Sequence, residues 1–80
     1  MQLTDLPDDS RARVKAVVDA APELEAGDLR RLGELGFIPG EPLHLIRRGP
    51  GGREPLAVQV GDTLFALRWV EARCVEVEPA

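Results

Sequence analysis

Alternating apolar and polar residues recur in short runs along the chain, and a period of two is typical of half-buried β-strands. The clearest run places Leu56, Val58 and Val60 on one face of a strand, with smaller or polar residues between them. Val75 and Val77 alternate with glutamates in the same way near the end of the sequence. The pattern predicts five strands, at residues 13–18, 43–48, 56–60, 63–67 and 75–78.

A helical period interrupts this pattern after the first predicted strand. Leu29, Leu32 and Leu35 recur at every third residue and form one apolar stripe along a helix. Asp28 can cap a helix that begins at Leu29, or the helix can begin near Pro22. The sequence leaves both starting points open.

Glycines mark the ends of several predicted elements. Gly36 can end the helix in a left-handed conformation, and Pro39-Gly40 predicts a type II turn. Residues 49–55 are rich in glycine and proline and predict a long hairpin loop. Gly33 lies inside the helix, where glycine costs about 1 kcal/mol relative to alanine. We therefore expect a neighbouring element to pack closely against Gly33.

Five short strands with one helix inserted after the first predict a mostly β fold. Residues 3–7 form an edge strand or a turn that leads into the first strand, and residues 69–74 form one turn of helix. Closely spaced short strands in a chain of this size favour a closed or partly closed barrel. We expect a small SH3-like barrel that forms a single domain over residues 1–80.

The length of 80 residues and the composition limit what this chain can do. It cannot form a large enzyme fold such as a TIM barrel, which needs about 250 residues. No apolar run approaches the roughly 18 residues of a membrane-spanning helix. One cysteine and one histidine exclude an internal disulfide and a zinc site of four such ligands. Because the first residues are acidic, unlike a signal peptide, we expect a cytoplasmic protein.

The ten basic and fourteen acidic residues give a net charge of −4. A negative chain does not attract a polyphosphate backbone at long range. The absence of tyrosine also removes one of the stacking residues that RNA-binding grooves use. We therefore expect no nucleic-acid partner.

Candidate chemistry outside a protein interface is sparse. His44 lies between apolar residues of a predicted strand and faces outward, where a histidine without a chemical role is the simpler interpretation. Cys74 has no second cysteine and is interpreted as a buried structural thiol. The aspartates at 5, 8 and 9 are interpreted as a solvated acidic face. The glycines at 49–52 lack the lysine and hydroxyl residue of a phosphate-binding loop. We expect no catalytic residue, no cofactor and no metal site.

Short motifs follow one another in a fixed order along the whole chain. Between Arg30 and Gly40, a Leu-Gly pair is followed after two residues by Pro-Gly. Further motifs lie at 3–6, in the glycine-rich loop, at 64–68, at 71–72 and at 75–77. Together they resemble the FeoA family, which comprises small cytoplasmic accessory proteins of bacterial ferrous-iron uptake. The long loop departs from the family pattern, because two charged residues separate Gly52 from Pro55.

This resemblance implies an SH3-like fold and a role beside FeoB, a membrane transporter with a cytoplasmic GTPase domain. Domains of the same kind form the C-terminal module of DtxR-like metal-dependent repressors. We therefore expect a non-enzymatic regulatory protein that interacts with a FeoB-like transporter. Any contact with the membrane would be made through that transporter. The alternative is an SH3-like peptide-binding or self-associating domain, as in the repressors. Self-association would make the chain a homo-oligomer, and the sequence leaves its oligomeric state open.

The partner-binding residues expected from the sequence lie around the turn that follows the helix. An apolar loop there would contact a partner, or its aromatic ring would instead plug the end of the barrel. Arginine and tryptophan are enriched in binding hot spots, although a tryptophan can equally cover the barrel mouth and arginines can equally be solvated. The expected set is Gly36, Phe37, Ile38, Pro39, Gly40, Arg30, Arg31, Arg68 and Trp69.

Overall fold

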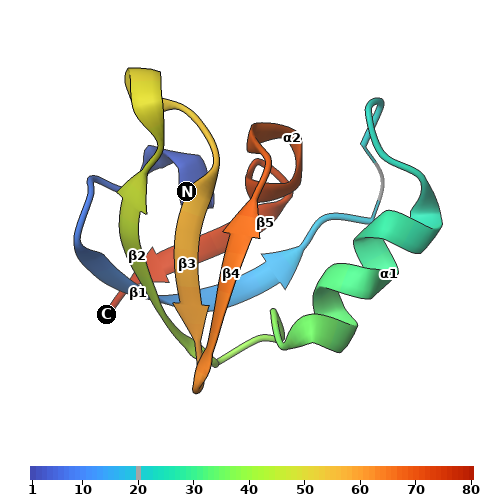
Figure 1. Cartoon of the computed structure of the whole chain (residues 1–80). Coiled ribbons are helices and arrows are strands. Elements are labelled where there is room, and N and C mark those ends of the chain that lie inside the picture. The colour runs from blue at the N-terminus through green and yellow to red at the C-terminus, as the bar shows by residue number, and fades with distance from the viewer. Residues whose placement is uncertain (20) are drawn as a thin grey trace.

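The computed structural model describes residues 1–19 and 21–80, and these residues build one antiparallel sheet of five strands. The sheet has the order β4-β3-β2-β1-β5 and curls so that β1 and β5 cross behind β3 and β4 (Figure 1). The predicted mostly β fold with one helix after the first strand is confirmed. The strands are β1 (Ser10–Val17), β2 (Pro42–Arg48), β3 (Leu56–Val60), β4 (Thr63–Leu67) and β5 (Val75–Pro79).

Four helical segments connect or precede these strands. They are η1 (Leu3–Asp5), α1 (Ala26–Leu35), η2 (Pro50–Gly52) and α2 (Trp69–Ala72). None of these helical segments has the length and apolar character that crossing a membrane requires. For residues 3–7 the turn interpretation is correct and the edge-strand alternative is wrong, because η1 lies there. Leu3 and Leu6 are three residues apart and both are buried, which suits a tight helical turn better than a strand.

Helix α1 begins at neither of the two residues that the sequence suggested. Glu25 is the N-cap, and the Asp28 carboxylate lies at the third helical position, where its Oδ2 accepts the Glu25 backbone N–H at 3.1 Å. Asp28 thus acts in a capping box and not as the cap itself. At the other end Gly36 has a φ of 120°, as expected of a residue that ends a helix.

The surroundings of Gly33 contradict the expectation of a close neighbour. Apart from the backbone of its own helix and its two chain neighbours, no heavy atom of the described residues lies within 4 Å of the position that a Cβ would occupy. We expect Gly33→Ala to raise the free energy of unfolding by up to about 1 kcal/mol, because alanine is the better helix former. Chemical denaturation checks this. Gly49→Ala should destabilise, since its Cβ would lie 2.7 Å from the Glu54 carbonyl oxygen. A destabilised Gly33→Ala variant would contradict the open surroundings of this helix face.

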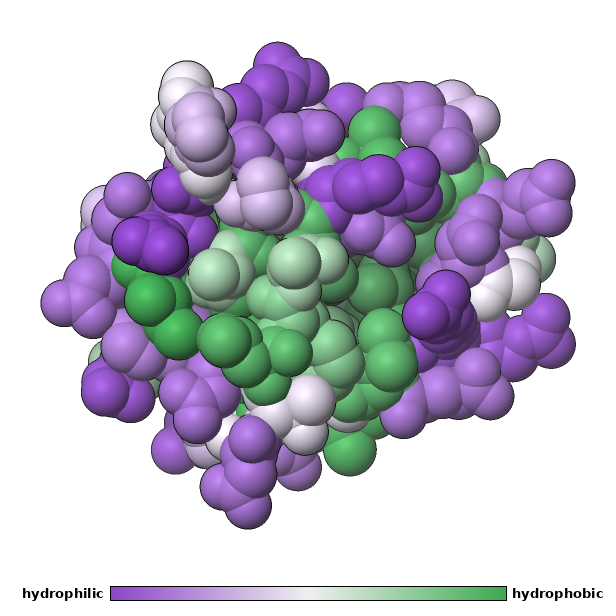
Figure 2. Space-filling model, viewed as in Figure 1, coloured by the Kyte–Doolittle hydropathy of each residue, from purple (hydrophilic) through white to green (hydrophobic). Residues whose placement is uncertain are grey.

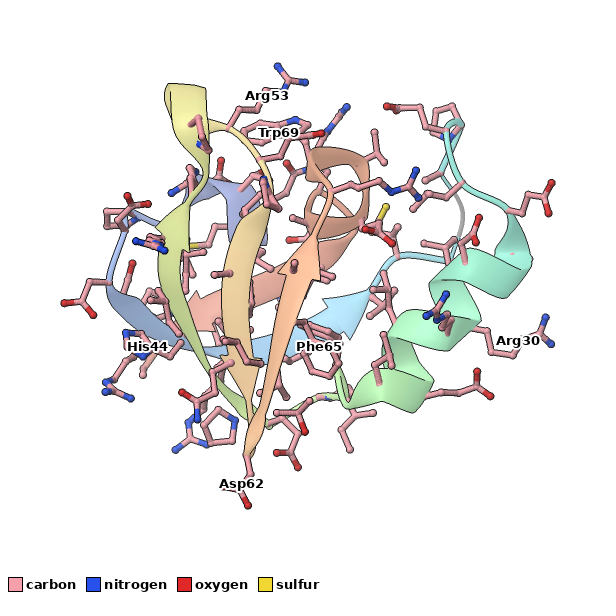
Figure 3. The ribbon with its side chains drawn as sticks, in the orientation of Figure 1. Arg30, His44, Arg53, Asp62, Phe65 and Trp69 are labelled. Atoms are coloured by element: carbon pink, nitrogen blue, oxygen red, sulfur yellow. The ribbon has the colours of Figure 1, made fainter. Side chains whose placement is uncertain are left out.

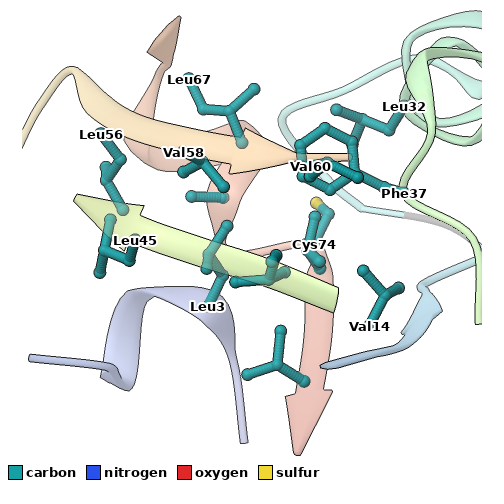
Figure 4. Close-up of a cluster of buried hydrophobic side chains, with 14 of the residues drawn as sticks. Leu3, Val14, Leu32, Phe37, Leu45, Leu56, Val58, Val60, Leu67 and Cys74 are labelled. Carbon is teal, nitrogen blue, oxygen red and sulfur yellow. The ribbon is translucent and has the colours of Figure 1, made fainter. Parts of the chain in front are cut away.

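The core lies inside the curl of the sheet and contains aliphatic side chains from all five strands (Figure 4). Leu56, Val58 and Val60 of β3 face inward as predicted. The register of β1 against β5 shifts between Val14 and Ala16, which marks a bulge in the first strand. Alternation therefore does not continue evenly along β1.

One edge of the sheet is covered by another segment of the chain, and the other edge is not. Along β5, Gln2 forms a bridge with Glu76, and the Val77 N–H donates to the Met1 carbonyl at 2.8 Å. The N-terminal segment thus covers this edge. No strand of the described chain pairs with the outer side of β4, where the sheet stays open.

One arginine fastens the N-terminal segment to the barrel. Nη2 of Arg48 in β2 donates to the carbonyl oxygens of Thr4 and Leu6, both at 2.8 Å. Its Nη1 donates to the Asp8 carboxylate at 2.8 Å. The Arg48 side chain is only 12% exposed, so these carbonyls have a partner where water has little access.

Candidate partner-binding surface

A groove of about 330 Å³ runs between α1 and β4, where the curled sheet is not closed by strand pairing. We call this surface the seam groove. Its apolar part comes from two leucines of α1 and from Phe65, whose ring lies between β4 and α1 (Figure 3). The residues that line the seam groove are Asp28, Arg31, Leu32, Leu35, Phe65, Ala66, Leu67, Arg68 and Glu71.

Exposed apolar side chains occur on the elements that form the seam groove and in the turn after α1, and of these Leu35 lines the groove itself. Leu64 of β4 is 62% exposed, Ile38 is 47% exposed and Leu35 is 36% exposed. Figure 2 shows apolar surface over the middle of this face, with hydrophilic side chains around it. A contiguous apolar area with a polar border is typical of a site that binds another protein.

Two arginines and two carboxylates line the seam groove, so its formal charges cancel. The carboxylates of Asp28 and Glu71 each accept a backbone N–H at the start of a helix, at 3.1 and 2.8 Å. Arg68 lies 3.4 Å from Glu71 but is 62% exposed, so most of its guanidinium is open to solvent. No carboxylate of the described residues lies within 4 Å of Arg31. Arg31 is therefore the groove cation that a carboxylate of a ligand can pair with.

Phe37, the first apolar residue of the expected loop, does not reach the surface. It is 1% exposed, and its ring lies 5.5 Å from that of Phe65, with an angle of 49° between them. Of the two interpretations of Phe37, the structure therefore supports the one in which the ring fills the end of the barrel. A partner cannot contact Phe37 without opening the core.

The rest of the loop is exposed and held by backbone hydrogen bonds. The Glu41 N–H donates to the Ile38 carbonyl at 3.1 Å, and Gly40 has a φ of 91°, as a type II turn requires. The Gly40 N–H donates to the Val14 carbonyl at 2.8 Å. Pro39 is exposed at the tip. The turn thus presents the Ile38 side chain on a fixed backbone.

Trp69 lies away from the seam groove, at the end of the barrel near the long loop (Figure 3). The Arg53 guanidinium carbon lies 4.6 Å from the centre of the indole ring. The Trp69 backbone N–H donates to the Glu54 carboxylate at 3.0 Å. The ring packs partly against the core, which agrees with the interpretation that it covers the barrel mouth.

The structure thus divides the nine residues expected from the sequence. Arg31 and Arg68 line one groove, whereas Ile38 and Arg30 are exposed but are not among the groove residues. Sequence reasoning missed Leu64 and the apolar lining of β4. A signal was present, because residues 63–67 contain no charge, so even the outward-facing positions of that strand are apolar.

A second hollow, of about 360 Å³, lies on the outer face of β1, β2 and β3. Two arginines line it, Arg11 and Arg13, together with His44. His44 is not simply an outward side chain, because its Nε2 lies 2.7 Å from the Asp9 carboxylate. That contact joins the N-terminal segment to β2 and gives the histidine a structural role.

The acidic residues near the N-terminus are exposed, as expected of a solvated face, and each also has a partner within the chain. The Asp5 carboxylate accepts the Gln2 N–H at 2.8 Å, while Asp8 pairs with Arg48 and Asp9 with His44. Among the residues at 1–19 and 21–80, no three histidine, cysteine or acidic side chains come together as metal ligands.

Cys74 is buried, as predicted, and its thiol Sγ lies 3.3 Å from the Val70 carbonyl oxygen. Burial raises the pKa of this thiol above its usual 9.0, and nearby Glu23 and Glu71 act in the same direction, whereas Arg73 opposes them.

We expect iodoacetamide to alkylate folded Cys74 slowly at pH 7–8, and faster as rising pH forms the thiolate. Mass spectrometry of the folded chain, with the urea-unfolded chain as control, checks this. Equal rates in the two states would contradict the burial.

The family model for the FeoA domain matches residues 1–79 of this chain. The chain belongs to the FeoA family. The crystal structure of FeoA from Stenotrophomonas maltophilia, complexed with zinc, is 46% identical and superposes with a TM-score of 0.85. The comparison covers 98% of this chain and 89% of that one. That protein is described as an SH3 domain protein and is discussed as a ferrous iron transport activating factor. The predicted SH3-like fold is thereby confirmed.

Two further likenesses place this FeoA-family chain among solved structures. FeoA of Chlorobium tepidum is 33% identical with a TM-score of 0.78, over 99% of this chain and 70% of that one. A manganese-dependent transcriptional repressor shares the fold at 20% identity, with a TM-score of 0.80 over 100% of this chain and 41% of that one. No curated protein sequence matches the chain.

Proposed function

We propose that this chain is a non-enzymatic accessory protein that binds the cytoplasmic region of a FeoB-like ferrous-iron transporter and regulates iron uptake. Membership of the FeoA family supports the link to ferrous-iron transport. The observation that carries a binding role is the seam groove, an exposed apolar surface with charged residues of both signs at its border. The protein would act in the cytoplasm, and it would meet the membrane through the transporter.

The chemistry of the seam groove suits protein binding better than catalysis. The Leu35 side chain and the partly buried Phe65 ring lose contact with water when a partner covers them, which supplies binding free energy. Exposed guanidinium groups at Arg31 and Arg68 can donate to carboxylates or carbonyls of the partner. The groove holds no histidine or cysteine that could serve as a base or nucleophile.

Co-purification with the cytoplasmic region of the cognate transporter tests this function. We expect wild-type chain to be retained, with and without bound guanine nucleotide tested separately. Leu35→Asp should lower retention at least about tenfold, because a carboxylate in an apolar contact loses its hydration without a partner. Leu35 is 36% exposed in the free chain and lies at the end of α1, so the fold should tolerate the change.

Pro50→Asp is the matched control, since it adds the same charge at an exposed position of η2, away from the seam groove. Its retention should equal that of the wild type. If no transporter region retains the chain under any nucleotide condition, the proposed function is wrong. If both aspartate variants bind like the wild type, the seam groove is not the docking site.

A further inference from the structure

We propose that the open edge of β4 accepts an extended, acidic segment of a partner protein as an additional strand of the sheet. This inference deepens the proposed function, because it states what kind of segment the seam groove binds. It depends on the hydrogen-bonding groups, the unprotected edge and the charge of this one surface.

The pairing of β3 with β4 determines which backbone groups of β4 point outward. The two strands are joined by the two-residue turn at residues 61–62, and Val60 pairs with Thr63. In such a hairpin the pairs with both hydrogen bonds alternate with pairs that have none. Leu64 and Ala66 belong to the second kind, so their N–H and C=O groups point away from β3. No hydrogen bond of the described chain engages them.

Natural sheets normally protect an open edge with lysine, proline, a bulge or a covering segment. The edge of β5 is covered by the first residues of the chain. The edge of β4 has no such device: Thr63–Leu67 contains no charge and no proline, and its register against β3 has no shift. An unprotected edge beside exposed apolar side chains is what a protein that binds extended segments needs.

The position of α1 favours a single extended segment over the edge strand of a second barrel. Helix α1 forms the far wall of the seam groove and lies alongside β4 (Figure 3). A strand that belongs to a folded sheet would bring its own neighbouring strand toward this wall. A free segment has no such neighbour, and it can place alternate side chains against Leu35 and Phe65.

Charge complementarity indicates that the segment is acidic. Arg31 on the helix side and Arg68 at the end of β4 are the cations of the groove, one on each wall. The two groove carboxylates balance these cations formally, but no carboxylate of the described residues lies within 4 Å of Arg31, so an acidic residue of the segment can pair with it. A segment that alternates apolar residues with aspartate or glutamate would therefore meet apolar lining with one face and guanidinium groups with its charges.

The test uses a synthetic nine-residue peptide of alternating valine and glutamate, added to the isotope-labelled full chain and followed by NMR. We expect amide shifts confined to β4 and the facing side of α1, and slower hydrogen exchange at Leu64 and Ala66. A peptide with lysine in place of glutamate is the charge control and should bind at least about tenfold more weakly, as expected of a complementary contact. Added salt should lower the affinity of the chain for the acidic peptide, because salt screens the attraction between opposite charges.

Two variants separate backbone pairing from charge. Ala66→Pro removes an N–H that no strand of this chain uses, so the fold should tolerate it and peptide binding should be lost. Arg31→Glu should weaken binding about tenfold, whereas Arg30→Glu, on the neighbouring exposed position outside the groove, should change it less than about twofold. The Arg31 and Arg30 pair keeps the test valid even if the proline variant fails to fold.

Several results would overturn this inference. Peptide shifts away from β4, unchanged exchange at Leu64 and Ala66, or equal effects of the Arg30 and Arg31 variants would each contradict strand addition. A concentration-dependent dimer through β4, seen by light scattering and lost in Ala66→Pro, would assign the edge to a second copy of this chain. If the peptide binds but the transporter does not, the inference is retained and the proposed function is rejected. If the transporter binds and Ala66→Pro does not weaken that binding, the proposed function is retained and the inference is rejected.

Discussion

Phe37→Ala should lower the free energy of unfolding by about 3–5 kcal/mol, the range measured when a buried aromatic ring is replaced by a methyl group. Phe37 is 1% exposed and contacts Phe65 across the end of the barrel. A domain of 80 residues has a total stability on the order of 4–12 kcal/mol, so the loss is a large part of it. Urea denaturation followed by Trp69 fluorescence measures the effect.

Ile38→Ala is the matched control for the neighbouring residue. Ile38 is 47% exposed, so its truncation should cost less than about 1 kcal/mol, because most of its surface already contacts water. Similar losses in the two variants would show that Phe37 does not fill the barrel end as described. The comparison also has a practical consequence for binding studies. A Phe37 variant that loses a partner would report unfolding, whereas Ile38 can be changed without opening the core.

Arg48→Ala should destabilise the chain by about 2–4 kcal/mol, because each polar group left without a partner away from water costs roughly 1–3 kcal/mol. The guanidinium holds the Thr4 and Leu6 carbonyls, and the side chain is 12% exposed. Its loss should also release the segment that covers β5. Faster hydrogen exchange at Val77, whose N–H donates to Met1, would report that release.

Arg47→Ala provides the comparison at the adjacent, exposed residue of β2. It should change stability by no more than about 0.5 kcal/mol, as surface substitutions without specific partners usually do. Arg48→Lys should not restore stability, since an ammonium group cannot reach two carbonyls and a carboxylate with the geometry of a guanidinium. Unchanged exchange at Val77 in Arg48→Ala would contradict the fastening role.

Much of the fold could be predicted from local sequence pattern, because the alternation of apolar residues marks the strands and the glycine positions mark the turns between elements. Strands β3 and β4 have the predicted bounds, because β3 alternates without interruption and the two-residue turn then sets the register of β4 against it. The start of α1 was missed because Asp28 can serve equally well as a cap or as the third residue of a capping box. The first residues form a tight turn, and only their burial against the barrel distinguishes this from an edge strand.

The candidate site was predicted less well, because it depends on which strand stays unpaired. Sequence pattern shows that Thr63–Leu67 is apolar, but it does not show that β4 is an edge or that α1 lies beside it. Arg31 and Arg30 look alike in sequence, and only their positions on α1 separate the groove residue from its neighbour. Phe37 was a candidate for contact because it follows the helix in a loop, yet its ring is part of the core.

The measurement that tests the central claim most directly is an NMR titration of the isotope-labelled chain with the cytoplasmic region of its FeoB-like transporter. We expect shifts at Arg31 and Leu35 on α1 and along Leu64–Arg68, with the second hollow around His44 unaffected. Shifts at His44 or around Trp69 in place of the seam groove would contradict the proposed surface. An unchanged spectrum in both nucleotide states would contradict direct binding to that region.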